Sequence, residues 1–538
     1  MTADTAPRDQ RSRAGRREWT GLAVLALACL LYVMDLTVLH LAVPAISADL
    51  RPSSAQLLWV IDVYGFFVAG SLITMGTLGD RIGRRRLLLI GAAGFGVVSL
   101  LAAFSVSSEM LIVSRALLGI AGATLAPSTL SLIFHMFQDP RQRSMAIGVW
   151  IGSFSAGSAI GPVLGGVMLE HFWWGSVFLL ALPVMALLLV LGPRVLPEYR
   201  DPDAGRLDLT SAAMSVVAVL AVTYGLKETA QDGFGPVPAL SILAGMAVGI
   251  LFVGRQRRLA DPMIDVRLFK NSAFNAALTI NFLAIFVAVG YFLFVAQYLQ
   301  LVAGLSPLEA GLWSLPSAFR FIVGSQLAPR IVRLLRPAFV IGGGFVLAAA
   351  GLVALTRVGA EGGLAPLVAG SVLISLGLAP VFGLTTELIV GSAPPERAGA
   401  ASGISETGAE LGGALGIAFL GSVGVAIYRS ALADRLPAEV PGAAAAIARD
   451  TLGGAVAVAG ELPDRLAAAV LQTAREAFVQ GMQLTSAIAA AVAVGLAILA
   501  VVMLRGRPAA SEPAPKGPAA DAVSATATHG RQLEAAEC

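Results

Sequence analysis

The chain has 538 residues, of which 57% are hydrophobic and only 13% charged, with a mean hydropathy of +0.80. This balance excludes a water-soluble globular protein of this size, because such a protein needs a polar surface to stay dissolved. The net charge of +3 is small and gives no indication of nucleic-acid binding. The two cysteines, Cys29 and Cys538, lie far apart in the chain, so we expect no disulfide framework.

Long apolar runs recur along the chain and predict membrane-spanning helices. A helix needs about 20 apolar residues to cross a bilayer, whereas a barrel strand alternates and has about ten residues. By this criterion we place about fourteen spans. They cover residues 20–44, 57–79, 87–105, 110–135, 144–168, 172–192, 208–226, 236–254, 273–302, 308–330, 338–356, 364–388, 399–427 and 481–504. We therefore predict an all-α, multi-pass protein of the cell (inner or plasma) membrane.

A charged segment separates the second and third runs: Gly76-Thr-Leu-Gly-Asp-Arg-Ile-Gly-Arg-Arg-Arg86. A bilayer core has no water to solvate its five charges, so the segment must lie at a membrane surface. The short loops predicted on the same side carry eighteen arginine and lysine residues, whereas those of the other side carry only Arg51, Lys227 and Arg357. The positive-inside bias therefore predicts that both termini are cytoplasmic.

The predicted spans fall into groups of six, two and six. We divide the chain into a cytoplasmic basic arm (1–19), an N-terminal six-helix bundle (20–192), a linker with two extra transmembrane helices (193–271), a C-terminal six-helix bundle (272–504) that includes a partly helical extracellular hairpin (428–480), and a cytoplasmic tail (505–538). The tail is rich in Ala, Pro and Ser and predicts disorder. The repeated grouping indicates the parallel repeats of a transporter.

Several acids fall within predicted spans, where charges are costly and mark function, and four of them are selected as candidates. They are the candidate substrate- and proton-binding residues Asp35, Asp62, Glu406 and Glu410. A buried carboxylate without a partner takes up a proton and releases it when water or a cation arrives. The four-residue spacing places Glu406 and Glu410 on one helix face. The alternative for each acid is a hydrogen bond that packs helices, and Asp62 could instead face water at the outer surface.

Two arginines lie well inside predicted spans. Arg115 should contact an acid or backbone carbonyls, unless it extends to the outer interface. Arg320 would either neutralise a glutamate or face away, and the sequence does not decide between them. Aromatic rings could line a cavity for flat cations, although most aromatics in spans only pack or sit at the interface. The cavity-lining candidates are Tyr32, Tyr64, Tyr298 and Gln297.

A run of small residues extends from Gly157 to Gly166 and contains one proline. One interpretation is a hinge at which the helix bends near Pro162. The simpler one is close packing of two helices, which small residues also permit. The hinge candidates are Gly157, Gly161, Pro162 and Gly165.

Taken together, these segments resemble the major facilitator superfamily, and specifically its fourteen-span drug:proton antiporters of the QacA/SmvA type. The similarity extends over about residues 20–504 and is carried by Gly76–Arg86, Met34–Pro44, Arg115 with Gly119, and Gly157–Gly166. The resemblance implies two six-helix bundles plus two extra transmembrane helices. It makes Arg115 a proton-relay residue and Gly157–Gly166 an antiporter motif. It also implies a conformational latch formed by Gly76, Asp80, Arg81, Gly83 and Arg84.

The resemblance implies a proton-coupled multidrug efflux antiporter that exports lipophilic cations, such as quaternary ammonium biocides, dyes and antibiotics, by alternating access. Its partners would be the lipid bilayer, cationic small molecules and protons, with no nucleic acid, and the chain would act as a monomer. We expect no cofactor, metal or catalytic residue, and no enzyme activity, because no nucleophile or phosphate-loop constellation appears. The alternatives are a dedicated exporter of one endogenous metabolite or antibiotic for self-resistance, an importer, and a membrane receptor that transports nothing.

Overall fold

The computed structural model describes residues 14–50, 52, 54–200, 208–232, 235–259, 262–394, 398–433, 435–437 and 439–505. Residues 1–13 of the predicted arm and 506–538 of the predicted tail lie outside this part. So do the side chains of a few helical residues, Asp62 and Pro162 among them.

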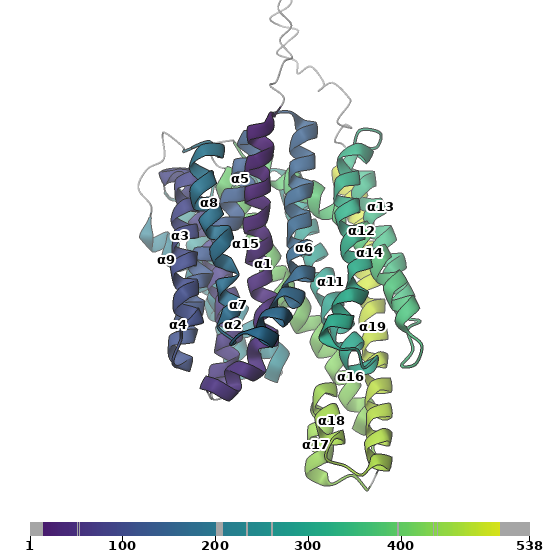
Figure 1. Ribbon diagram of the computed structural model, residues 1–538. Helices are drawn as coiled ribbons and strands as arrows, with labels where there is room; N and C mark the ends of the chain where they lie inside the picture. Colours follow the sequence, from purple (N-terminus) through teal and green to yellow (C-terminus); the bar gives the residue numbers. More distant parts are fainter. Residues whose placement is uncertain are drawn as a thin grey trace, which may run out of the picture.

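The described chain is a bundle of long helices (Figure 1). The first half contains α1 (Arg16–Leu50), α2 (Ser54–Ile82), α3 (Arg84–Ala103), α4 (Ser108–Gly122), α5 (Leu125–Met136), α6 (Pro140–His171), α7 (Ser176–Leu179) and α8 (Ala181–Val195). Two further helices follow, α9 (Leu209–Asp232) and α10 (Pro236–Gln256), and then the short η1 (Val266–Lys270).

The second half contains α11 (Ser272–Gln297), η2 (Tyr298–Val302), α12 (Pro307–Ile331), α13 (Pro337–Leu355), α14 (Leu364–Val390), α15 (Ala398–Gly416), η4 (Ile417–Gly421), α16 (Ser422–Ala433), α17 (Gly442–Asp450), α18 (Leu452–Ala459) and α19 (Asp464–Leu504). We call the end of the bundle at which α1 begins, uppermost in Figure 1, the upper end, and the opposite end, from which α17 and α18 project, the lower end.

Twelve helical segments of the described chain are long and apolar enough to cross a membrane. This finding confirms an all-α, multi-pass membrane protein. The twelve do not include the predicted spans 57–79 and 308–330, which correspond to α2 and α12. Both helices nevertheless pack within the bundle, α2 against α4 and α12 against α14.

Local signals in the sequence set where several helices begin. Asp139 accepts hydrogen bonds from the backbone N–H groups of Arg141 and Gln142 and so caps α6, whose first residue is Pro140. Ser306 and Glu309 form a reciprocal capping box at the start of α12. These caps satisfy backbone donors that helix starts otherwise leave without partners.

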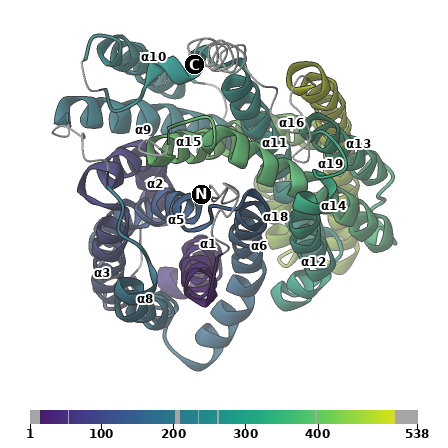
Figure 2. The same ribbon diagram turned by 90° about the horizontal axis from the view of Figure 1, so that it is seen from above.

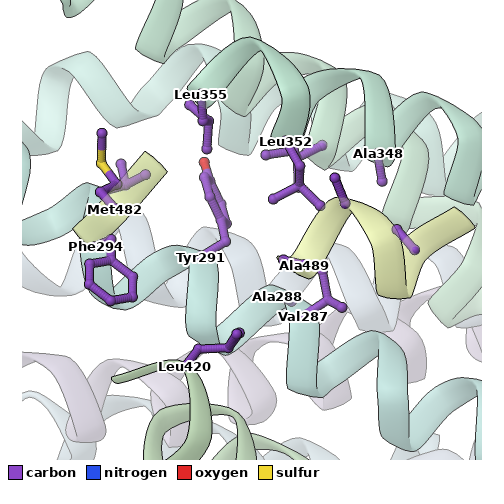
Figure 3. Close-up of a cluster of buried hydrophobic side chains, with 14 of the residues drawn as sticks. Val287, Ala288, Tyr291, Phe294, Ala348, Leu352, Leu355, Leu420, Met482 and Ala489 are labelled. Atoms are coloured by element: carbon purple, nitrogen blue, oxygen red, sulfur yellow. The ribbon is translucent and has the colours of Figure 1, made fainter. Parts of the chain in front are cut away.

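Each half has its own apolar core. In the second half, Figure 3 shows side chains from α11, α13, η4 and α19 meeting around Tyr291. The core of the first half is built from α1 to α8. Seen from above in Figure 2, α15 lies beside α2, α5 and α9, so the two halves and the extra helix α9 meet along it.

Candidate functional site

The acid of α1 is paired with the arginine of α4. The Arg115 Nη1 atom lies 2.5 Å from Asp35 Oδ2, and the side chains are 1% and 10% exposed, respectively. The Arg115 Nε–H also donates to the Val60 carbonyl at 3.3 Å. The expectation that Arg115 contacts an acid or a backbone carbonyl is therefore confirmed, because both contacts are present. A guanidinium buried this deeply needs such partners to offset its lost hydration.

Aromatic rings enclose this ion pair. The Arg115 guanidinium carbon lies 4.5 Å from the Tyr64 ring centroid and 6.0 Å from that of Phe178. The Tyr64 and Tyr32 rings are 6.2 Å apart, and the Tyr64 hydroxyl reaches the Tyr32 carbonyl at 3.5 Å. Ring faces attract cations, so this wall stabilises Arg115 and fixes its orientation toward Asp35.

The acids of α15 face the same region from the other half of the chain. The Tyr32 hydroxyl of α1 donates to Glu410 Oε1 at 3.4 Å, across 378 residues of sequence. Glu406 lies one helical turn away and has no hydrogen-bond or ion-pair partner in the part of the chain that the structure describes. The structure thus brings Asp35, Tyr32, Tyr64, Glu406 and Glu410 together where the halves meet.

Thr129 of α5 and Phe154 of α6 were not assigned to a site from the sequence. The Trp150 indole N–H donates to Thr129 Oγ1 at 2.9 Å, and Phe154 lies edge-on to Trp150 with ring centroids 4.7 Å apart. Phe154 also contacts the Tyr32 ring edge-on at 6.2 Å. No local pattern distinguishes these residues from ordinary core residues, since only the packing of α1, α5 and α6 brings them together.

The charged segment forms the contact between halves at the upper end. The Asp80 carboxylate pairs with Arg84 and accepts a hydrogen bond from the Ala400 N–H at 3.1 Å. A Cβ atom at Gly76 would lie 2.5 Å from the Gly399 carbonyl oxygen, so only glycine permits this approach of α2 to α15. One contact between the halves therefore includes Gly76, Asp80 and Arg84 on its first side, and the start of α15 forms its second side.

The turn from α2 to α3 depends on Gly83, whose φ of +112° is rarely adopted by other residues. A Cβ atom there would also lie 2.5 Å from Glu198 Oε1. Glu198 in turn accepts from the Arg85 N–H at 3.1 Å, which ties the turn to the segment after α8. Arg81 lies half-buried beside it in the last turn of α2.

The small residues of α6 pack against α1. A Cβ atom at Gly157 would lie 2.4 Å from the Leu30 carbonyl oxygen, and one at Gly165 would lie 2.7 Å from Val38 Cγ1. Gly161 is buried, and α6 runs without interruption from Pro140 to His171. This geometry favours the close-packing alternative for the segment. The hinge remains a prediction.

The other candidates lie elsewhere or outside the described part. The Tyr298 hydroxyl donates to the Gly359 carbonyl at 2.7 Å within the second half, and Gln297, which precedes it, is half-buried. Arg320 is exposed on α12. The side chain of Asp62, like that of Pro162, lies outside the described residues.

A polar network anchors the start of α9. Arg255 binds Asp208 at 2.8 Å, and Gln256 donates to Ser211 Oγ at 2.7 Å. Burial by itself would raise the pKa of Asp208, but hydrogen bonds from Ser211 and Arg255 outweigh it and hold this pKa below its ordinary value. In the described residues, no group of three His, Cys, Asp or Glu side chains is placed to hold a metal ion.

Comparison with known proteins identifies relatives that share this architecture. The family described as Major Facilitator Superfamily matches residues 25–417. The multidrug efflux pump LfrA of Mycolicibacterium smegmatis is 44% identical over 494 residues, which cover 92% of this chain and 98% of the relative. The methyl viologen resistance protein SmvA of Salmonella typhimurium is 37% identical over 468 residues, which cover 86% and 93%.

The fold has solved counterparts. The human organic anion transporter MFSD10 superposes with a TM-score of 0.59 at 18% identity, over 90% of this chain and 99% of that one. A bacterial homologue of the lysosomal transporter Spinster gives a TM-score of 0.55 at 20% identity, over 91% and 99%. At these identities the likeness concerns the fold alone. The sequence match and the shared fold agree, and this chain belongs to the major facilitator superfamily.

Proposed function

We propose that this chain is a proton-coupled multidrug efflux antiporter that exports lipophilic cations. The observation that carries the proposal is the meeting of Asp35, Tyr32 and Glu410 at the contact between the two halves, with Glu406 one turn away. Carboxyl groups held out of water accept either a proton or another cation. A site with several such groups supports exchange of one for the other. The relatives named as a multidrug efflux pump and a methyl viologen resistance protein add independent support.

The proposal includes fourteen spans, because α2 and α12 accompany the twelve apolar segments inside the bundle. We assign the upper end to the cytoplasm, as the positive-inside bias of the loops predicts. The latch at Asp80 and Arg84 then closes the cytoplasmic side. On the α6 side, the Ser325 hydroxyl donates to the Gly148 carbonyl at 3.2 Å and joins the halves again. We therefore propose that the site is closed to the cytoplasm in this conformation.

In the proposed cycle, protons bind the α15 carboxylates from the outside and displace the drug cation. The halves then rock, the latch opens, and a cytoplasmic cation displaces the protons inward. Arg115 holds Asp35 in place and responds to the charge on the neighbouring acids. The aromatic rings beside these acids favour the binding of flat, lipophilic cations.

Transport by inverted membrane vesicles tests the proposal. With an acidic lumen, vesicles holding this protein should accumulate methyl viologen or ethidium, and dissipating the pH gradient should release the dye. The Glu410→Gln variant should not respond to the gradient. Accumulation that is indifferent to the pH gradient would refute proton coupling, and no accumulation of any cation would refute the substrate class.

A second candidate is a dedicated antibiotic exporter. The tetracenomycin C resistance and export protein of Streptomyces glaucescens is 34% identical over 499 residues, covering 91% of this chain and 93% of the relative. A dedicated exporter would confer resistance to one compound and leave sensitivity to unrelated cationic dyes unchanged. A panel of growth assays separates the two candidates.

A further inference from the structure

The extra helix α9 is fixed tightly against α2. The Tyr224 ring stacks on Trp59 with centroids 6.3 Å apart and an angle of 11°, and it meets Phe66 edge-on at the same distance. Nearer the upper end, Thr74 Oγ1 lies 3.3 Å from Ser215 Oγ. These contacts along α9 fix which of its side chains face the bundle.

One of those side chains is a lysine. The Lys227 ammonium lies 4.8 Å from the Phe66 ring centroid, and Phe66 is only 6% exposed. A cation over a buried ring of α2 is directed into the protein and away from lipid. Lys227 was expected in an outer loop from the sequence, but the structure places it within α9. The apolar criterion for spans ended that helix too early.

The packing of α15 on α2 sets the depth of this ammonium. A Cβ atom at Gly403 would lie 2.9 Å from the Leu72 carbonyl oxygen, so these two residues are at one level. Glu410 lies seven residues farther along α15, and Phe66 lies six residues back along the antiparallel α2. At 1.5 Å per residue both are about 10 Å from that level, toward the lower end. The positive charge of Lys227 also acts on the Glu410 carboxylate.

We propose that Lys227 is a charge-selectivity residue: its ammonium, held on Phe66 at the level of Glu410, disfavours dications relative to monocations of the same shape. This inference rests on the proposed function for the substrate class. The fixed ammonium repels each positive charge of a bound ligand separately, so a second charge on the ligand lowers its affinity further. Replacing Lys227 removes that repulsion.

A matched ligand series measures this effect. Methyl viologen has two positive charges, its monomethyl bipyridinium analogue has one, and 4,4′-bipyridine is neutral at pH 7.5. Dissociation constants would be measured by equilibrium dialysis on the full-length protein in nanodiscs. The ratio of the two cation affinities removes every effect that does not depend on ligand charge, such as a change in packing. It therefore reports the electrostatic effect of position 227 on the bound cation.

For Lys227→Gln we expect the preference for the dication over the monocation to rise by about three- to tenfold, with binding of 4,4′-bipyridine unchanged. Lys227→Arg should keep the wild-type ratio, because it keeps the charge. Lys270→Gln, at the exposed end of η1, removes the same net charge elsewhere and should also keep the ratio.

An equal change for all three ligands in Lys227→Gln would show a packing role and overturn the inference. The same holds if Lys227→Arg behaves like Lys227→Gln. If the wild type binds neither cation, the proposed substrate class fails. If it binds both and the ratio does not respond to position 227, only the role of Lys227 fails.

Discussion

The two sides of the central site hold their carboxylates in different ways. Asp35, on α1, is balanced by Arg115 at 2.5 Å, and both side chains are nearly inaccessible. On α15, Glu410 receives only the Tyr32 hydroxyl from the first half, and Glu406 has no hydrogen-bond or ion-pair partner in the described chain. A buried arginine that loses its acid is left as an uncompensated charge, so the pair is expected to stabilise the structure as a unit. We therefore propose that Asp35 supports the structure of the site and that the acids of α15 exchange protons and cations.

The largest expected effect is a loss of stability when the ion pair between Asp35 and Arg115 is broken. Asp35→Asn should lower the free energy of unfolding by about 3–5 kcal/mol, because it leaves the buried Arg115 uncompensated. Denaturant unfolding in detergent micelles measures the change. The double variant Asp35→Asn/Arg115→Gln should lose less stability than Asp35→Asn alone. Additive losses from the two single substitutions would contradict a coupled pair.

The opposite pattern is expected on α15. Glu410→Gln should change the free energy of unfolding by less than about 1 kcal/mol, since a neutral amide costs no more to bury than a carboxylate without an arginine. It should nevertheless stop dye accumulation driven by the pH gradient in inverted vesicles. Glu361→Gln, in the exposed loop before α14, is the matched control and should transport normally. If Glu410→Gln destabilises the protein as much as Asp35→Asn does, the distinction between the two sides is wrong.

This division between the two sides was only partly predictable. The sequence indicated that Arg115 contacts an acid or backbone carbonyls, since a buried guanidinium needs such partners, but it did not identify Asp35 as the acid. The contact of Tyr32 with Glu410 did not follow from the sequence, because the two residues lie 378 positions apart and meet only when the halves pack together. Helix type was predictable from apolar runs, but α19 begins at Asp464, before the predicted start at residue 481. A polar, alanine-rich helix continues past the membrane surface without any apolar signal.

The proposed latch offers a second ion pair with which to sharpen the comparison, because it lies where the halves meet and does not line the site. Asp80→Asn should weaken closure at the upper end, since Arg84 and the Ala400 N–H lose their charged partner. A cysteine at the buried Ser402, in a chain without native cysteines, should then react with a thiol reagent about tenfold faster, as expected for a loss of about 1.4 kcal/mol. Unchanged reactivity would mean that Asp80 does not hold the halves together.

The smallest effect is expected at the hydroxyl that links the two sides. Tyr32→Phe keeps the ring beside Tyr64 and Phe154 but removes the 3.4 Å hydrogen bond to Glu410. The bond is long, so we expect a change of about two- to fivefold in the dissociation constant for a monocation, or about 0.5–1 kcal/mol. Tyr298→Phe is the control, because it removes a 2.7 Å hydrogen bond to Gly359 away from the acids and should leave cation affinity unchanged. Equal shifts in both variants would indicate a general loss of packing, and the link between the halves would then have no special part in binding.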